Sequence, residues 1–189
     1  MGKFFENLGA VLVAGLVLAI LLMLLPEAGF RPPAGELNGI LQWSHVFFGI
    51  TWIGLLYYFN FVQIPTMPSV PAELKPGVTK HIAPVALFYF RWGAALTVLT
   101  GLILAWSYGE LRQAMELQAG YRLIGIGMWL ALIMAFNVWF IIWPAQKKAL
   151  GMVPADDAAK ASSARTAMVT SRINTMLSIP MLLAMTNAH

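Results

Sequence analysis

Cysteine is absent from the 189 residues of this chain. Its absence excludes disulfides, thiolate metal sites, iron–sulfur clusters and covalently attached c-type haem. Any metal bound by the chain must therefore have histidine, methionine or oxygen ligands. Histidine is also scarce, because the sequence has only His45, His81 and His189.

Charged residues are also few in this sequence. Charged residues make up 11% of the chain, whereas a typical soluble domain has about 25%. Hydrophobic residues make up 59% and occur in long runs. The net charge of +4 comes from basic residues grouped in particular loops, which indicates membrane topology rather than nucleic-acid binding. We therefore predict a multi-pass membrane protein with the lipid bilayer as a partner and no nucleic-acid partner.

Five apolar runs are long enough to be transmembrane helices, since about 20 apolar residues cross a bilayer. We expect a single all-α domain over residues 1–189, a polytopic membrane helical bundle of about five spans. The first run is interpreted as a retained helix rather than a signal peptide. Prolines should interrupt residues 63–80, Pro144 should close the fourth span and Pro180 should kink the fifth. The expected spans are 7–25, 38–62, 84–107, 121–143 and 166–187.

The distribution of lysine and arginine predicts the orientation. With five spans and a cytoplasmic N-terminus, nine basic residues lie inside and three outside, which is the positive-inside bias. We therefore predict a cytoplasmic N-terminus, a periplasmic C-terminus and a location in the bacterial inner (cytoplasmic) membrane. The inner residues are Lys3, Lys75, Lys80, Arg91, Lys147, Lys148, Lys160, Arg165 and Arg172, and the outer ones are Arg31, Arg112 and Arg122.

One histidine, His45, lies within the second expected span. At helical spacing Gln42, His45, Gly49 and Trp52 share a face. Gly49 has no side chain, so a flat macrocycle could approach the backbone there. An ionisable group inside a membrane span is a functional-site hypothesis by default. The alternative, a histidine hydrogen-bonded to a neighbouring helix, stays open at this point.

The expected topology decides which histidines can meet. The second span enters from the outer face and the fifth ends there, so His45 and His189 should lie at similar depth. His81 should lie at the inner face. We predict that His45 and His189 are the axial ligands of a b-type haem, which needs no cysteine. Gln42 and Ser44 are candidates for hydrogen bonds around it, and a His–Met pair with Met181 or Met185 is the alternative.

A second polar set lies toward the inner half of the expected bundle. It contains Arg91, Arg172, Asn137 and Asn174, and no span contains an aspartate or glutamate. Arg172 is expected to extend to the inner interface. Arg91 is deeper, and its partner could be a helix-end carbonyl, a haem propionate, a lipid phosphate or an anionic ligand. We therefore count Arg91 among the candidate cofactor-binding residues.

Four stretches in chain order cover most of residues 40–189: HVFFGITWIGLLYYFNFV (45–62), FRWGAALTVLTGLIL (90–104), NVWFIIWPAQKKAL (137–150) and RINTMLSIPMLLAMTNAH (172–189). Together they resemble the membrane-bound urate oxidase (urate hydroxylase) N-terminal domain family. The resemblance implies a membrane haem protein that passes electrons to a periplasmic c-type cytochrome, with an oxidoreductase activity.

Family members are usually fused to a c-type cytochrome, whereas this sequence has no CxxCH motif. Gly93 also stands where the family tends to have an acidic residue. The expectation is therefore an electron-transfer module or a subunit of a larger redox complex.

Two other functions are consistent with the residues. The early span with His45, Trp52, Tyr58 and Pro65 is similar to that of membrane haem-b protoporphyrinogen oxidases, although the further histidine of that family is lacking here. A cofactor-free structural or assembly subunit is the other alternative. A transporter is disfavoured, because the spans contain no carboxylates to line a path.

Overall fold

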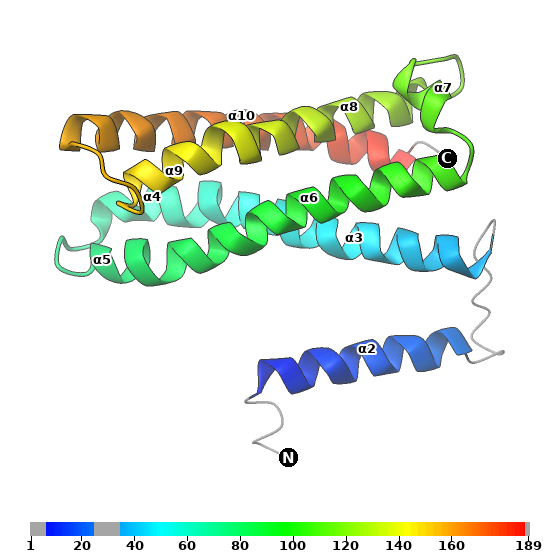
Figure 1. Ribbon diagram of the computed structural model, residues 1–189, viewed down its shortest axis with the longest axis horizontal. Coiled ribbons are helices and arrows are strands. Elements are labelled where there is room, and N and C mark those ends of the chain that lie inside the picture. Colours follow the sequence, from blue (N-terminus) through cyan, green and yellow to red (C-terminus); the bar gives the residue numbers. More distant parts are fainter. Residues whose placement is uncertain (1–6, 25–34, 188–189) are drawn as a thin grey trace. The chain divides into compact units, whose positions relative to one another are not determined.

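The computed structural model describes residues 7–24 and 35–187, and throughout these ranges the regular structure is helical (Figure 1). This confirms the predicted all-α class. By internal contacts the chain forms two units, residues 1–39 and 40–189. The first contains α2 (Leu8–Leu24), which has no charged residue and exposes aliphatic side chains such as Leu12, Val17 and Leu18. The single domain over 1–189 stays a prediction.

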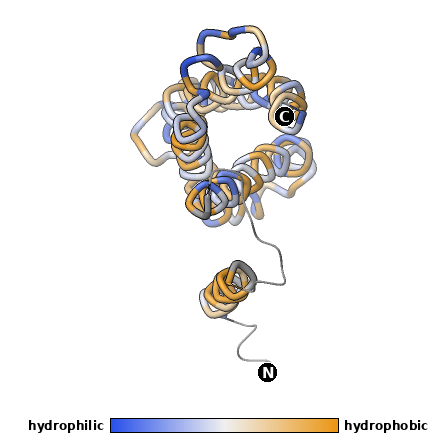
Figure 2. The backbone as a smooth tube through the Cα atoms, turned by 90° about the vertical axis from the view of Figure 1, so that its right-hand side faces the viewer, coloured by the Kyte–Doolittle hydropathy of each residue, from blue (hydrophilic) through white to orange (hydrophobic). Residues whose placement is uncertain are grey.

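The second unit is a bundle of four long helical rods that run alternately up and down (Figure 1). Viewed along their length, the rods surround a common axis (Figure 2). The first rod is α3 (Glu36–Tyr57), η2 (Tyr58–Gln63), α4 (Ile64–Thr66) and η3 (Met67–Ser69). The second is α5 (Lys75–Gly77), η4 (Val78–Ile82) and α6 (Ala83–Ser107). After the short α7 (Leu111–Met115), the third is α8 (Arg122–Phe136), η5 (Asn137–Ile142) and α9 (Trp143–Ala149), and the fourth is α10 (Asp157–Asn187).

The rods extend beyond the spans expected from the sequence. Three described helices are long and apolar enough to cross a membrane: Leu37–Ser69, Lys75–Ser107 and Arg122–Ala149. The expectation that Pro144 closes the fourth span is wrong, because the helix continues through it into α9. The predicted interruption of 63–80 is narrower than expected and falls at Val70, where the backbone is extended.

Local π-helical turns explain how these rods tolerate proline. The segments η2, η4 and η5 are π-helical, and each is followed within two residues by Pro65, Pro84 or Pro144. Proline lacks an N–H donor and clashes with the preceding turn of an α-helix. Adjusting the hydrogen-bond spacing locally allows an apolar helix to continue past it. Pro180 lies inside α10, which continues to Asn187.

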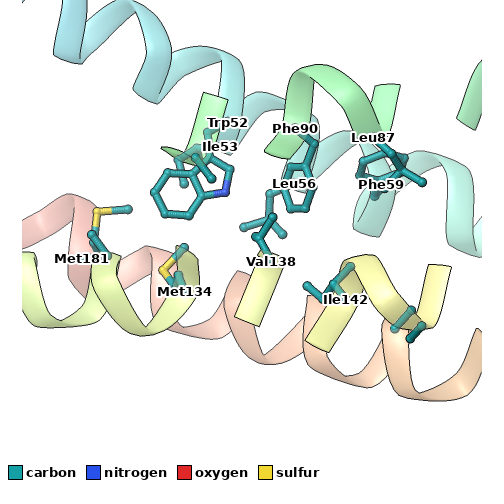
Figure 3. Close-up of a cluster of buried hydrophobic side chains, with 14 residues drawn as sticks. Trp52, Ile53, Leu56, Phe59, Leu87, Phe90, Met134, Val138, Ile142 and Met181 are labelled. Atoms are coloured by element: carbon teal, nitrogen blue, oxygen red, sulfur yellow. The ribbon is translucent and has the colours of Figure 1, made fainter. Parts of the chain in front are cut away.

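The core of the bundle is contributed by all four rods. Trp52 and Leu56 of α3 are fully buried, and the ring of Phe59 lies edge-on to Phe90 with centroids 5.6 Å apart. Figure 3 shows these side chains facing Met134, Val138 and Ile142 of the third rod and Met181 of α10. Close helix contact requires small residues at two points: a Cβ at Gly93 would lie 3.2 Å from the Trp52 backbone nitrogen, and one at Gly125 would meet the Ala114 carbonyl.

Helix α10 has the reverse of the usual amphipathic pattern. Its buried side chains include Thr170, Ser171, Asn174 and Ser178. Its exposed side chains include large apolar residues, namely Ile173, Met176, Ile179 and Leu183. Its polar residues, which include the exposed Arg172, lower the average hydropathy of α10, and this helix is not among the three candidate spans.

Candidate functional site

His45 lies on α3 and points its ring at α6. Its Nδ1 atom is 2.9 Å from the Thr97 carbonyl oxygen and 3.4 Å from the Thr100 hydroxyl oxygen. A carbonyl oxygen only accepts hydrogen bonds, so Nδ1 must carry the proton. In the neutral imidazole Nε2 then has a free lone pair.

This arrangement is the one that metal-bound histidines adopt, because the ring nitrogen that does not bind the metal usually donates to a carbonyl or carboxylate. The ring has room because position 101 is glycine. A Cβ there would lie 2.7 Å from His45 Cε1 and 3.0 Å from Nδ1. Thr97, Thr100 and Gly101 therefore set the orientation of the imidazole. These three residues are not distinctive in the sequence, although Thr97 and Gly101 are four apart and share a helix face.

The other candidate residues around His45 have different environments. Gln42 is exposed, and a Cβ added at Gly49 would lie 3.8 Å from the Thr97 methyl group, so Gly49 faces α6. Trp52 is fully buried in the core, and its Nε1 atom has no hydrogen-bond partner. Ser44 bonds to the Ile40 carbonyl on its own helix at 2.8 Å.

Of the two remaining histidines, the structure describes His81 but not His189. His189 lies outside the described residues, so its role as an axial ligand stays a prediction. Helix α10, which ends at Asn187, finishes at the end of the bundle where α3 begins (Figure 1). His81 lies on η4 near α5, at the opposite end of the bundle, and is exposed.

Arg91 lies on α6 and faces the third rod. Its guanidinium carbon is 3.4 Å from the centroid of the Trp143 ring. The Trp139 indole N–H donates to the Arg91 carbonyl at 3.2 Å. The side chain is buried, and its Nε and Nη1 atoms have no hydrogen-bond partner. Arg172 is exposed, and its extension to the inner interface stays a prediction.

Buried amides connect α10 to the other rods. Asn137 Nδ2 donates to Asn174 Oδ1 at 2.8 Å, and Asn174 Nδ2 donates to the Met134 carbonyl at 2.9 Å. Asn60 Nδ2 donates to the Ser171 hydroxyl at 2.8 Å. The Oδ1 atom of Asn60 and the Oε1 atom of Gln63 are buried without a partner. Asn137 and Asn174 stand out in the sequence as polar residues in apolar runs, but their pairing is seen only in the structure.

An exposed ion pair lies outside the long rods, where α7 leads toward α8. Arg112 Nε donates to Glu116 Oε1 at 2.8 Å. This hydrogen bond, with a second one from Gln118, lowers the pKa of Glu116 below its ordinary value. Among the residues that the structure describes, no group of three or more histidine or carboxylate side chains is placed to hold a metal ion.

Comparison with known protein families identifies a match over about half of the chain. The family model described as Urate oxidase N-terminal matches residues 93–189. The chain belongs to this family. No curated protein and no solved structure matches it. The Urate oxidase N-terminal match includes several of the residues described above. They are Thr97, Thr100 and Gly101, which orient His45, the Asn137–Asn174 pair and Trp143. His45 and Arg91 precede the matched residues.

Proposed function

We propose that this protein is a membrane-embedded b-type haem protein that transfers electrons toward a periplasmic c-type cytochrome, alone or within a larger redox complex. The observation that carries the proposal is the hydrogen bond of 2.9 Å from His45 Nδ1 to the Thr97 carbonyl. It leaves Nε2 as a neutral nitrogen ligand inside an apolar bundle. Membership of the Urate oxidase N-terminal family supports an oxidoreductase setting.

The described residues fit one side of a haem site. His45 would supply an axial nitrogen, the Thr97 carbonyl would hold the ring orientation and the Nδ1 proton, and Gly101 leaves room for the ring. We propose His189 as the second ligand, with Met181 or Met185 as the alternative. When bound, the haem supplies one-electron redox chemistry.

We further propose that α2 and α10 also span the membrane, which makes five spans with the N-terminus cytoplasmic in the bacterial inner membrane. The exposed apolar face of α10 and its buried polar face support this, because lipid favours apolar contact and disfavours unpaired polar groups. The 17 residues of α2 are close to the length needed to cross a bilayer. The positive-inside bias supports the orientation.

The haem proposal is tested by purifying the full chain in detergent and recording a dithionite-reduced minus oxidised absorption spectrum. We expect Soret and α bands of b-type haem. His45→Ala should abolish these bands or convert them to those of a five-coordinate haem, because it removes one axial nitrogen. The matched control is His81→Ala, which removes an exposed imidazole at the other end of the bundle.

Two outcomes would overturn the haem proposal. One is a folded, colourless wild-type preparation from cells supplied with haem precursor, which would favour the structural-subunit alternative. The other is a spectrum that is unchanged in His45→Ala, which would show that a bound haem is held elsewhere.

A further inference from the structure

A buried cation without an acidic partner lies where α6 meets η5 and α9. Arg91 is 9% exposed, and two of its guanidinium nitrogens, Nε and Nη1, have no hydrogen-bond partner. The ion pairs among the described residues are Arg112–Glu116 and Lys160–Asp157, and neither involves Arg91. A buried charge with unpaired donors is strongly unfavourable. The donors of Arg91 are therefore suited to oxygen atoms that this part of the chain does not itself supply.

One tryptophan contacts the guanidinium of Arg91, and a second bonds to the backbone of the same residue. The Trp143 ring lies 3.4 Å from Arg91 Cζ, and the Trp139 indole bonds to the Arg91 backbone carbonyl. A guanidinium that contacts an aromatic face keeps its donors available in its own plane. Trp139 belongs to the π-helical segment η5, and π-helical turns are frequent at functional sites. The side chain is therefore pre-positioned, which lowers the entropy lost when a ligand binds.

Lys147 adds a second positive charge at the same indole. Its Nζ atom lies 5.6 Å from the centroid of the Trp143 ring. It follows Trp143 by four residues and so lies one turn further along α9. Lys147 is half-buried and, like Arg91, is absent from both ion pairs of the described residues. Two cations thus lie near one indole ring, the arginine buried and the lysine half-buried.

We propose that Arg91, Trp143 and Lys147 form a binding site for an anionic group with several oxygen atoms, a phosphate or a carboxylate. Arginine and lysine bind such groups through charge-assisted hydrogen bonds. The group would come from a lipid headgroup or from a small soluble anion, since both offer the same acceptors.

This site is separate from His45 and does not rest on the haem proposal. Arg91 precedes Thr97 by six residues, about 9 Å along the axis of α6. His45 contacts Thr97, whereas the guanidinium of Arg91 contacts the third rod. The anion site can therefore be tested on protein with or without a bound cofactor.

The test measures the thermal unfolding midpoint (Tm) of the full chain. In phosphate-free detergent we add inorganic phosphate or succinate, with sodium chloride at equal ionic strength as the reference. In parallel, the chain is placed in nanodiscs of phosphatidylcholine with or without phosphatidylglycerol. Binding to the folded state should raise the Tm by several degrees. A rise with phosphate or succinate identifies a soluble anion, and a rise only with phosphatidylglycerol identifies a lipid headgroup.

Variants assign the effect to the site. Arg91→Met should abolish the anion-dependent rise and should itself unfold at a temperature no lower than the ligand-free wild type, because it removes an unpaired buried charge. Lys147→Met should weaken apparent binding about tenfold, as expected for one lost charge-assisted contact. The matched control is Arg112→Met, an exposed arginine paired with Glu116, which should respond as the wild type does.

Three results would overturn the anion site. The first is a wild-type Tm that rises no more with the anions than with chloride. The second is an anion-dependent rise in Tm that persists in Arg91→Met. The third result concerns a haem-containing preparation in which anions do not raise the wild-type Tm. If Arg91→Met then changes the haem spectrum, Arg91 would instead be assigned to a haem propionate.

Discussion

At the scale of single residues, the candidate site depends on which groups of α6 contact the His45 ring. The imidazole is oriented by a main-chain carbonyl and given room by a residue without a side chain, Gly101. Neither feature is chemically distinctive in the sequence, because every residue has a carbonyl and the chain has 16 glycines. The predicted ligand residue His45 is thus joined by partners that were not predicted, Thr97, Thr100 and Gly101.

Gly101→Ala should displace the His45 ring. The new methyl group would lie 2.7 Å from Cε1, which is too close for the present position of the ring. We expect a loss of about 1–3 kcal/mol in stability from overpacking, and a shifted or weakened haem spectrum as the Nδ1 bond to Thr97 is strained. Both are measured on detergent-purified protein by thermal unfolding and by absorption.

The matched control for this substitution is Gly54→Ala on α3, where an added Cβ would meet nothing within 4 Å. It should leave the haem spectrum unchanged and should not lower the thermal unfolding midpoint, because alanine is the better helix former. If Gly101→Ala behaved like Gly54→Ala, the close approach of His45 to position 101 would be refuted.

At the scale of helices, two features depart from simple hydropathy rules. The π-helical segments carry three rods past prolines, two of which, Pro65 and Pro144, were expected to interrupt or end them. Helix α10 buries its polar side and exposes its apolar side. The buried Asn174 amide of α10 bonds to Asn137 and to the Met134 carbonyl of the third rod. These bonds, rather than apolar burial alone, fix the rotation of α10 against its neighbour.

Asn174→Leu should destabilise the bundle. The substitution leaves the buried Asn137 side-chain amide without its acceptor. It also removes one hydrogen bond to the Met134 carbonyl, which keeps the one from the Asn137 backbone N–H. Each buried polar group left unpaired costs about 1–3 kcal/mol. The measurement is thermal unfolding followed by circular dichroism in detergent.

Asn187→Leu is the control for Asn174→Leu, because it makes the same change on the same helix at an exposed residue. Its amide bonds only within α10, to the Leu183 carbonyl and the Thr186 hydroxyl. We expect a much smaller change in Tm. Equal effects of the two substitutions would contradict the role assigned to the Asn137–Asn174 pair.

At the scale of the whole molecule, the described part of the bundle, residues 40–187, has a surface suited to contact with lipid. Large apolar side chains such as Ile50, Phe140 and Ile179 are each more than half exposed. Buried positions include asparagine, serine, threonine and arginine. In water such a surface would associate, whereas in a bilayer it matches its surroundings.

The proposed five-span topology can be tested by labelling, since a chain without cysteine accepts single cysteines cleanly. In intact spheroplasts, a membrane-impermeant maleimide should label Ala119→Cys, between α7 and α8, but not Met152→Cys, between α9 and α10. Met152→Cys should be labelled after permeabilisation. Ile179→Cys, on the exposed apolar face of α10, should be protected throughout because lipid covers it.

Labelling of Ile179→Cys as fast as Ala119→Cys would show that this face of α10 is in water, and the count of five spans would fall. Labelling of Met152→Cys in intact spheroplasts would reverse the predicted orientation. Each of these results tests the topology alone, whereas haem binding is tested separately by the absorption spectrum.

The sequence by itself determined the helical class, the exclusion of thiolate chemistry and the family, which the match over residues 93–189 confirms. These properties follow from composition, from long apolar runs and from local motifs, which are all readable along the chain. It also drew attention to His45, Arg91, Asn137 and Asn174, because polar groups in apolar runs stand out.

Only the tertiary structure decided which of these groups meet. It joins His45 to Thr97, Arg91 to Trp143 and Asn137 to Asn174, across sequence separations of tens of residues. In helices that are apolar on nearly every side, hydropathy says little about rotation or neighbours. Those are set by close packing at small residues such as Gly93 and Gly101 and by the pairing of buried polar groups, which exist only once the rods are assembled.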